Sequence, residues 1–158
     1  MSISVDGQIC FGFLFEDDYE FPWDLEPQDN PYEDLDDWWV YCVKGFKHSF
    51  EIYEGRDYLG GIKPADDKIF AYHGEYKKFL EENPVPVELL NCCSGDRPQY
   101  ILTIKRSCLT ANCGEPATFN PETLKVDNSE VEKLKAFVAE HKLEPKSGPS
   151  WWLCSYYG

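Results

Sequence analysis

The chain has 158 residues, of which 42% are apolar and 16% aromatic, and its formal net charge is −14. This length and apolar content suit one folded domain with its own core, and they exclude a chain that is disordered throughout. The negative charge argues against direct binding to nucleic acid or to an anionic membrane. No basic leader and no apolar run of about 20 residues is present, so we expect a cytoplasmic protein without a membrane partner.

The first predicted element is a β-hairpin over residues 3–15. Ile3 and Val5 alternate with polar residues, and Asp6-Gly7 is a favoured turn pair. After the turn, every second residue from position 9 to 15 is a large apolar one, so these residues share one face. Gly12, inside the second strand, predicts a bulge or close packing against a neighbouring strand. The prolines of the following residues, 16–37, exclude a continuous helix or a central strand there.

Two further strands are predicted over 37–45 and 48–55, because both stretches are rich in aromatic and β-branched residues. A helix is predicted over 67–83, where Asn83-Pro84 ends the pattern. Its apolar face follows the helical period. The residues of that face are Ile69, Tyr72, His73, Tyr76 and Leu80.

The second half of the chain predicts strands over 85–93 and 99–106, a second helix over 128–142 and a final strand over 151–158. Residues 107–122 read as irregular. Ser129 and Glu132 form a capping-box pattern at the start of this helix. Its predicted inward residues are Val131, Leu134, Phe137, Val138 and His141.

Strands that run in clusters, instead of alternating with helices, are typical of α+β proteins. We therefore predict a single α+β domain over 1–158, with a mainly antiparallel sheet of about six to seven strands and two helices.

The segment 16–37 carries most of the net charge. It holds eleven carboxylates and no Lys or Arg, and residues 1–43 hold twelve acids before the first base, Lys44. Subtraction from the 29 acids and 15 bases of the whole chain leaves seventeen acids and fifteen bases for residues 44–158. Such asymmetry indicates a functional surface or tail.

Three interpretations of this segment stay open: a solvated loop that aids solubility, a charged interaction surface, and a calcium site. The calcium interpretation lacks the EF-hand spacing of ligands. For an interaction surface, Phe21, Trp23, Tyr32 and Leu35 would dock inward and hold the acids outward. The predicted partner-binding residues are Glu16, Asp17, Asp18, Glu20, Trp23, Asp24, Glu26, Asp29, Glu33, Asp34, Asp36, Asp37, Trp38 and Trp39.

The seven cysteines fit reduced thiols inside a core. A zinc site from Cys92, Cys93, Cys108 and Cys113 has poor spacing, because vicinal cysteines on a strand point to opposite faces. No phosphate-binding loop, nucleophile elbow or metalloprotease motif is present. We therefore predict no catalytic residue, no metal and no cofactor.

Three stretches, "DWWVYCVKGF", "NPVPVELLNCCSGDRPQYIL" and "GPSWWLCSYYG", resemble uncharacterised small acidic accessory proteins of tailed bacteriophages. The resemblance implies a phage accessory protein that acts in the host cytoplasm and disables a host defence by binding it, as anti-CRISPR and anti-restriction proteins do. It carries over no site residues.

The expected function is a non-enzymatic inhibitor that covers the basic, nucleic-acid-binding surface of a host protein or ribonucleoprotein complex. An immunity protein that neutralises a basic nuclease toxin is an alternative with the same physics. An enzyme that uses a metal on the carboxylates, or the thiol of Cys92 or Cys93, is the alternative from another class.

Overall fold

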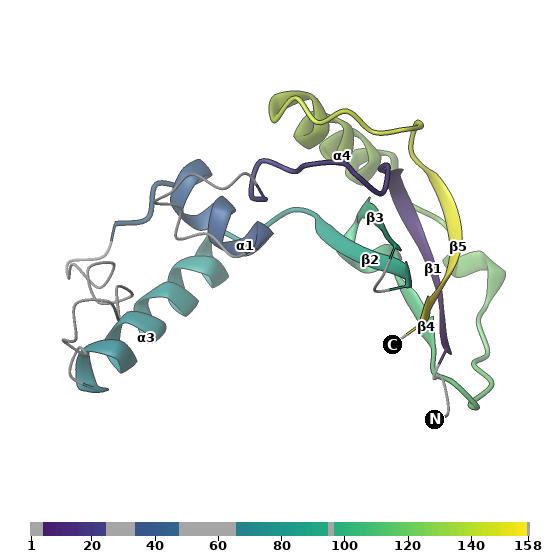
Figure 1. Cartoon of the computed structure of the whole chain (residues 1–158), viewed down its shortest axis with the longest axis horizontal. Helices are drawn as coiled ribbons and strands as arrows, with labels where there is room; N and C mark the ends of the chain where they lie inside the picture. The colour runs from purple at the N-terminus through teal and green to yellow at the C-terminus, as the bar shows by residue number, and fades with distance from the viewer. Residues whose placement is uncertain (1–4, 25–33, 48–65, 95–96, 158) are drawn as a thin grey trace. The chain divides into compact units, whose positions relative to one another are not determined.

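The computed structural model describes residues 5–24, 34–47, 66–94 and 97–157. The chain divides into two compact units, one made of residues 1–19 and 86–158 and the other of residues 20–85. Each unit is considered by itself below, and the single domain predicted over 1–158 stays a prediction. Together the described residues form an α+β fold with one sheet (Figure 1).

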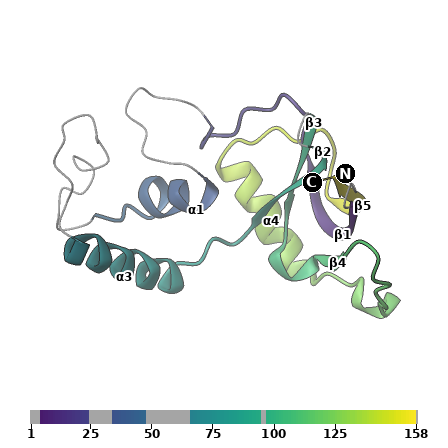
Figure 2. The same cartoon turned by 60° about the horizontal axis from the view of Figure 1, so that its bottom comes forward.

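The first unit is built around a five-stranded sheet in the order β3-β2-β5-β1-β4. Its strands are β1 (Val5–Leu14), β2 (Glu88–Ser94), β3 (Arg97–Thr103), β4 (Leu109–Ala111) and β5 (Ser150–Tyr157). The pairs are antiparallel except β2 with β5, which run parallel. Because β1 also pairs with β3, the strands β1, β5, β2 and β3 form a closed ring. Figure 2 shows β1 beside β5.

The hairpin predicted over 3–15 is wrong, because β1 is one continuous strand through Asp6-Gly7. On one edge Gly7 pairs with Ser155 of β5, and on the other it pairs with Ala111 of β4. Pairing on both edges supplies more backbone hydrogen bonds than a local turn, so the long-range partners override the turn propensity.

Gly12 lies where β1 crosses from its pairing with β4 to its pairing with β3. It pairs with Thr103 of β3 on one side and Ser150 of β5 on the other. A β-carbon at this position would lie 2.9 Å from the carbonyl carbon of Leu102 and closer still to its oxygen. The predicted close packing is confirmed, and it closes the ring of strands.

The strands predicted over 85–93, 99–106 and 151–158 correspond to β2, β3 and β5. The short strand β4 and the one-turn 3₁₀ helices Lys105–Ser107 and Pro121–Thr123 lie in or next to the stretch expected to be irregular. The described residues give five strands instead of the predicted six to seven.

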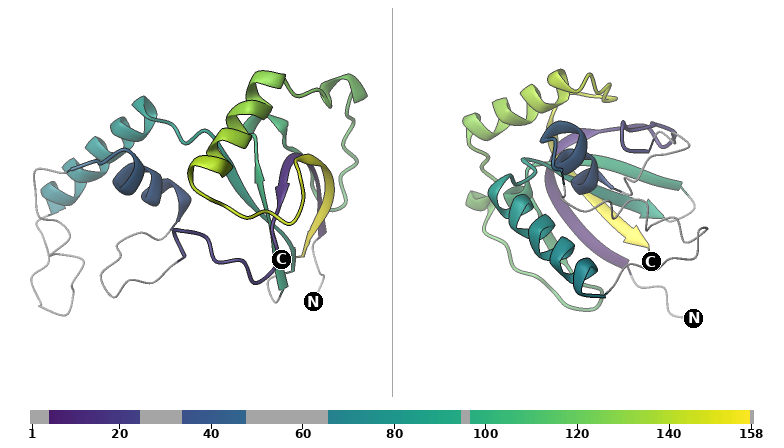
Figure 3. Two further views of the ribbon diagram at one scale, coloured as in Figure 1. Left: turned by 90° about the horizontal axis from the view of Figure 1, so that it is seen from above. Right: turned by 90° about the vertical axis from the view of Figure 1, so that its left-hand side faces the viewer.

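Helix α4 (Asn128–Glu140) lies alongside the sheet (Figure 3). Leu134, Phe137 and Val138 are buried, which confirms its predicted inward face. The predicted capping box is wrong: the N-cap is Asp127, whose Oδ1 accepts the Ser129 backbone N–H at 2.8 Å. An aspartate at this position satisfies an N–H group that the first turn leaves free.

The second unit contains α1 (Leu35–Trp38), the π-helical turn Trp39–Val43 that continues it, and α3 (Asp66–Glu82). The strand predicted over 37–45 is therefore wrong, and the strand predicted over 48–55 lies outside the described residues. Asp34 caps α1, and Asp36 and Asp37 lie in its first turn. These features favour a helix start over the β-propensity of the following aromatic run.

The helix predicted over 67–83 is confirmed by α3, but His73 of its predicted apolar face is exposed. Tyr76 of the predicted face and Phe79, which was not predicted, both pack against Phe46, with ring centroids 6.2 Å and 4.8 Å away. Within the described ranges, none of the helices combines the length and the apolar character needed to cross a bilayer.

Candidate functional site

The acidic segment begins in the turn after β1. The Tyr19 N–H donates to the Glu16 carbonyl at 3.3 Å, and the carboxylates of Glu16, Asp17 and Asp18 are exposed. Glu16 forms an ion pair with Lys146 at 2.8 Å, which raises the pKa of that lysine through the hydrogen bond and the opposite charge. Asp17 and Asp18 are exposed and form no ion pair with any residue that the structure describes, although the charge of Asp17 also helps to raise the pKa of Lys146.

A second turn follows at Phe21–Asp24 in the other unit. The Asp24 N–H donates to the Phe21 carbonyl at 2.9 Å, and the Phe21 N–H donates to Asp24 Oδ2 at 3.1 Å. The rings of Phe21 and Trp23 stack with centroids 4.7 Å apart, and they are 0% and 5% exposed. Glu20 and Asp24 are exposed. The turn therefore holds its aromatic rings inside and its carboxylates outside.

The third acidic group lies at the start of α1. Asp34 Oδ1 accepts the Asp37 N–H at 2.9 Å, and Asp37 Oδ1 accepts the Tyr76 hydroxyl of α3 at 2.8 Å. Burial raises the pKa of Tyr76, and the bond to Asp37 and the negative charges of Asp37, Asp34 and Asp36 raise it further. Asp34 and Asp37 therefore support the local fold as well as carrying charge.

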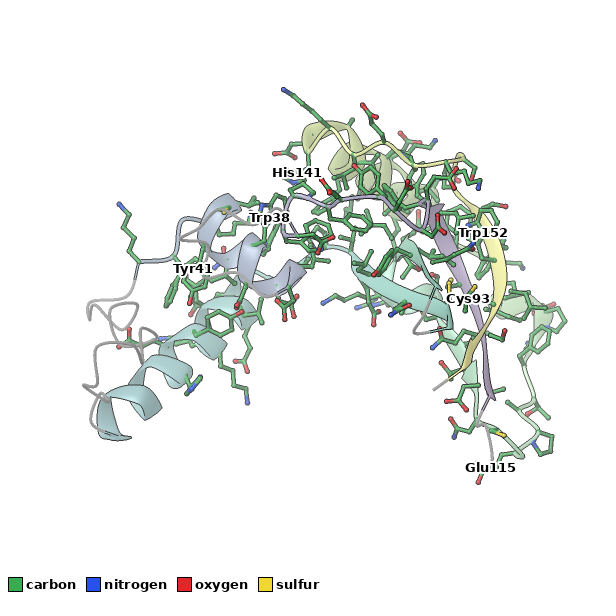
Figure 4. The ribbon with its side chains drawn as sticks, in the orientation of Figure 1. Trp38, Tyr41, Cys93, Glu115, His141 and Trp152 are labelled. Carbon is green, nitrogen blue, oxygen red and sulfur yellow. The ribbon has the colours of Figure 1, made fainter. Side chains whose placement is uncertain are left out.

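The tryptophans predicted to meet a partner lie inside the second unit. Trp38 and Trp39 are 9% and 8% exposed, and both lie in helical turns instead of alternating across a strand. Trp38 packs on Trp23 with centroids 5.3 Å apart. Trp39 donates its indole N–H to the Asn83 carbonyl at 3.0 Å, and Lys44 Nζ lies 4.5 Å from its ring centroid. Figure 4 labels Trp38 on α1 and Tyr41 on the π-helical turn that follows it.

Trp23, Trp38 and Trp39 are all predicted partner contacts, and all three rings are buried within the second unit. These three indoles belong to the core of the second unit, and little of their own surface is exposed to a partner. Of the other predicted contact residues, Glu26, Asp29 and Glu33 lie outside the described residues, and Asp36 is half-buried.

The two units share the charge unequally. Residues 20–85 contain 16 acids and 7 bases, a net charge of −9, whereas residues 1–19 and 86–158 contain 13 acids and 8 bases, a net charge of −5. The two values add to the −14 of the whole chain. Most of the negative charge thus belongs to the unit that holds the larger part of the acidic segment.

Three of the four cysteines considered for zinc share one apolar cluster of the sheet. Cys92 is a buried member of this cluster, Cys93 and Cys108 pack against it, and Cys113 is exposed. Cys93 has a φ of 77°, so the strict alternation expected for vicinal cysteines does not hold there. Across the described ranges, no group of three or more His, Cys, Asp or Glu side chains is arranged to hold a metal ion.

The inner face of the closed sheet carries a grouping that the sequence did not reveal. Cys10 and Cys92 form a buried cluster with Ile101, and Cys154 packs against it. These three cysteines are far apart in the chain, and only the strand order brings them together. Cys10 follows Ile9 and Cys154 follows Leu153 in apolar stretches, which indicate burial but not proximity, whereas Cys92 follows the polar Asn91.

Comparison with models of protein families, with curated proteins and with solved structures finds no match. A function for this chain therefore has to be argued from its own residues.

Proposed function

We propose that this chain is a non-enzymatic inhibitor whose exposed carboxylates cover the basic, nucleic-acid-binding surface of a host protein or ribonucleoprotein complex. The exposed carboxylates of the described part of the segment are those of Glu16, which pairs with Lys146, and of Asp17, Asp18, Glu20, Asp24 and Asp34. The setting is that of a phage protein directed against a host defence, of the anti-CRISPR or DNA-mimic type, acting in the host cytoplasm.

One observation carries the proposal: in the described part of the segment, Phe21 and Trp23 are buried while the carboxylates next to them are exposed. Phe21, Trp23 and Leu35 are in the core, whereas Glu20, Asp24 and Asp34 face solvent. Like charges held together repel and lower stability, so a fold that fixes them needs an apolar core to offset the repulsion. A loop that only aids solubility has no need of buried tryptophans.

The backbone at these positions is also defined by hydrogen bonds. In the first unit the turn at residues 16–19 defines the backbone that carries Asp17 and Asp18. In the second unit the turn at residues 21–24 and the cap at Asp34 do the same for Asp24 and Asp34. Preorganised charges lose less entropy on binding than charges on a flexible tail. Carboxylates at such places can take the positions that nucleic-acid phosphates occupy on lysines and arginines.

The test is capture from a bacterial host lysate by the tagged full-length chain, at about 50 mM and about 500 mM salt, with the bound protein identified by mass spectrometry. We expect a basic nucleic-acid-binding protein at low salt and a loss of at least tenfold in yield at high salt, an order set by the screening of exposed charges. Capture that is equal at both salt concentrations contradicts the proposal.

A matched pair of variants separates local charge from total charge. Asp17→Asn, Asp18→Asn and Glu20→Gln together remove three exposed carboxylates of the segment. Glu115→Gln, Glu122→Gln and Glu140→Gln together remove three exposed carboxylates elsewhere. We expect the first triple variant to reduce capture about tenfold and the second to leave it almost unchanged. Equal effects would show that only the net charge matters.

The identity of the captured protein decides between the proposal and its nearest alternative. A subunit of a defence complex supports an inhibitor, and a basic nuclease toxin supports an immunity protein that uses the same carboxylates.

A further inference from the structure

The thiols of Cys10, Cys92 and Cys154 form a group that the proposed function does not use. They come from β1, β2 and β5, which are neighbours in the closed ring of strands. Cys10 and Cys92 are 0% and 2% exposed, and Cys154 is half-buried. Leu14, Leu90 and Trp152 pack around the group, and Figure 4 labels Cys93 and Trp152 in the same unit.

The hydrogen bonds within this group single out Cys154. Its sulfur has side-chain hydrogen bonds to Cys10 and then Cys92, which lower the pKa of Cys154. The same bonds, with burial, raise the pKa of Cys10 and of Cys92. As thiols, Cys154 donates to the Gln8 carbonyl at 3.7 Å and Cys92 donates to the Gln99 carbonyl at 3.2 Å. Cys154 is also the one member of this group that is not buried, so a thiolate there, the nucleophilic form of cysteine, is within reach of a small reagent.

An unused acceptor lies beside this sulfur. Gln8 pairs directly with Cys154 across β1 and β5, so both side chains lie on the same face of the sheet. The Gln8 Oε1 atom is buried and has no hydrogen-bond partner among the described residues. A buried acceptor without a donor is costly, so a donor that forms at Cys154 would satisfy it.

The strand register decides which thiol fits a disulfide with Cys154. Cys93 pairs with Tyr156, which places the preceding residue, Cys92, near Ser155 and about one residue from Cys154. The φ of 77° at Cys93 breaks the alternation of faces in β2, and Cys154 packs against the cluster that contains Cys92. With strands about 4.8 Å apart and a rise of about 3.3 Å per residue, the Cα atoms of Cys92 and Cys154 lie roughly 6 Å apart. Cys10 pairs with Trp152, two residues from Cys154, and such diagonal neighbours are about 7–8 Å apart. A disulfide requires about 4.4–6.8 Å, so only Cys92 fits.

We propose that Cys154 is a site of oxidation by peroxides and that Cys92 is its resolving thiol. The Cys154 thiolate attacks a peroxide oxygen, the O–O bond breaks, and the leaving alkoxide or hydroxide takes a proton from water. The sulfur is oxidised by two electrons to a sulfenic acid, whose O–H donates to Gln8 Oε1. The Cys92 sulfur then displaces the hydroxyl group, so the S–S bond forms, the S–O bond breaks, and the Cys92 proton leaves with it as water.

The test is treatment of the reduced full-length protein with one equivalent of hydrogen peroxide, followed by peptide mapping. We expect a Cys92–Cys154 disulfide as the main product, formed several-fold more slowly in Cys10→Ala, which loses one donor to the thiolate. In Cys92→Ala the sulfenic acid cannot be resolved, so dimedone should label Cys154. Cys42 and Cys113 are exposed and serve as internal controls in the same sample.

The outcome that overturns the proposal is oxidation that follows exposure alone, with Cys42 or Cys113 modified before Cys154. A Cys10–Cys154 or Cys10–Cys92 disulfide as the main product also overturns it. Peptide mapping of the oxidised protein without any substitution identifies the disulfide directly, so the proposal stays testable where Cys92→Ala does not fold.

Discussion

Replacing Gly12 with alanine should unfold or nearly unfold the closed sheet. The new β-carbon would lie 2.9 Å from the Leu102 carbonyl carbon and 3.0 Å from Ile101 Cγ2. Backbone atoms cannot rotate away as a flexible side chain does, so β1 and β3 have to separate where they close the ring. Overpacking of this kind costs about 3 kcal/mol or more, a large part of the stability of a small protein. Thermal unfolding followed by circular dichroism measures the loss.

Gly7→Ala is the matched control, because Gly7 lies on the same strand and its added β-carbon would meet only Ala111 Cβ, at 4.0 Å. We expect Gly7→Ala to change the free energy of unfolding by less than about 1 kcal/mol. Equal stability of the two variants would show that β1 and β3 do not approach as closely as described.

Replacing Trp23 with alanine should have the largest effect in the second unit. Its ring stacks on Phe21 and lies against Trp38, and it is 5% exposed. Loss of a buried aromatic ring costs about 3–5 kcal/mol through lost burial and the cavity that remains. Hydrogen exchange of the full-length protein should show faster exchange in α1 and the following π-helical turn, because Trp38 packs directly on Trp23.

Phe119→Ala is the control for this prediction, since Phe119 is 51% exposed and its loss should change stability by less than about 0.5 kcal/mol. A Trp23→Ala protein that keeps its stability but loses its partner would contradict the placement of this ring in the core. It would instead restore the prediction that Trp23 is a contact residue.

The elements that could be predicted from the sequence are those whose signals are local. Residues 66–82 and 128–140 carry a helical period with breakers or caps nearby, and β2, β3 and β5 are apolar runs between turn residues. The closure of β1 on β3 depends on Gly12 meeting Leu102 across 90 residues of chain. No local pattern encodes such a pairing, and so the cysteine group on the inner face was not predictable either.

Residues 38–43 show why the strand predicted over 37–45 is wrong. Its aromatic and β-branched residues favour a strand, yet it forms a helix and a π-helical turn. The cap by Asp34 and the Trp39 indole bond to Asn83 of the chain after α3 stabilise the helical form. Asp34 and Asp37 are predicted partner contacts, but their hydrogen bonds also stabilise the local fold. Mutational tests of binding should therefore leave both residues in place.

The docking role of the acidic segment is the central claim, and the rate of association with the captured partner tests it most directly. Exposed charges are screened within about 8–10 Å at physiological ionic strength, and steered association rates fall steeply with salt. We predict that the association rate falls at least tenfold between about 50 mM and about 500 mM salt, while the dissociation rate changes little. An association rate that is independent of salt would contradict the account.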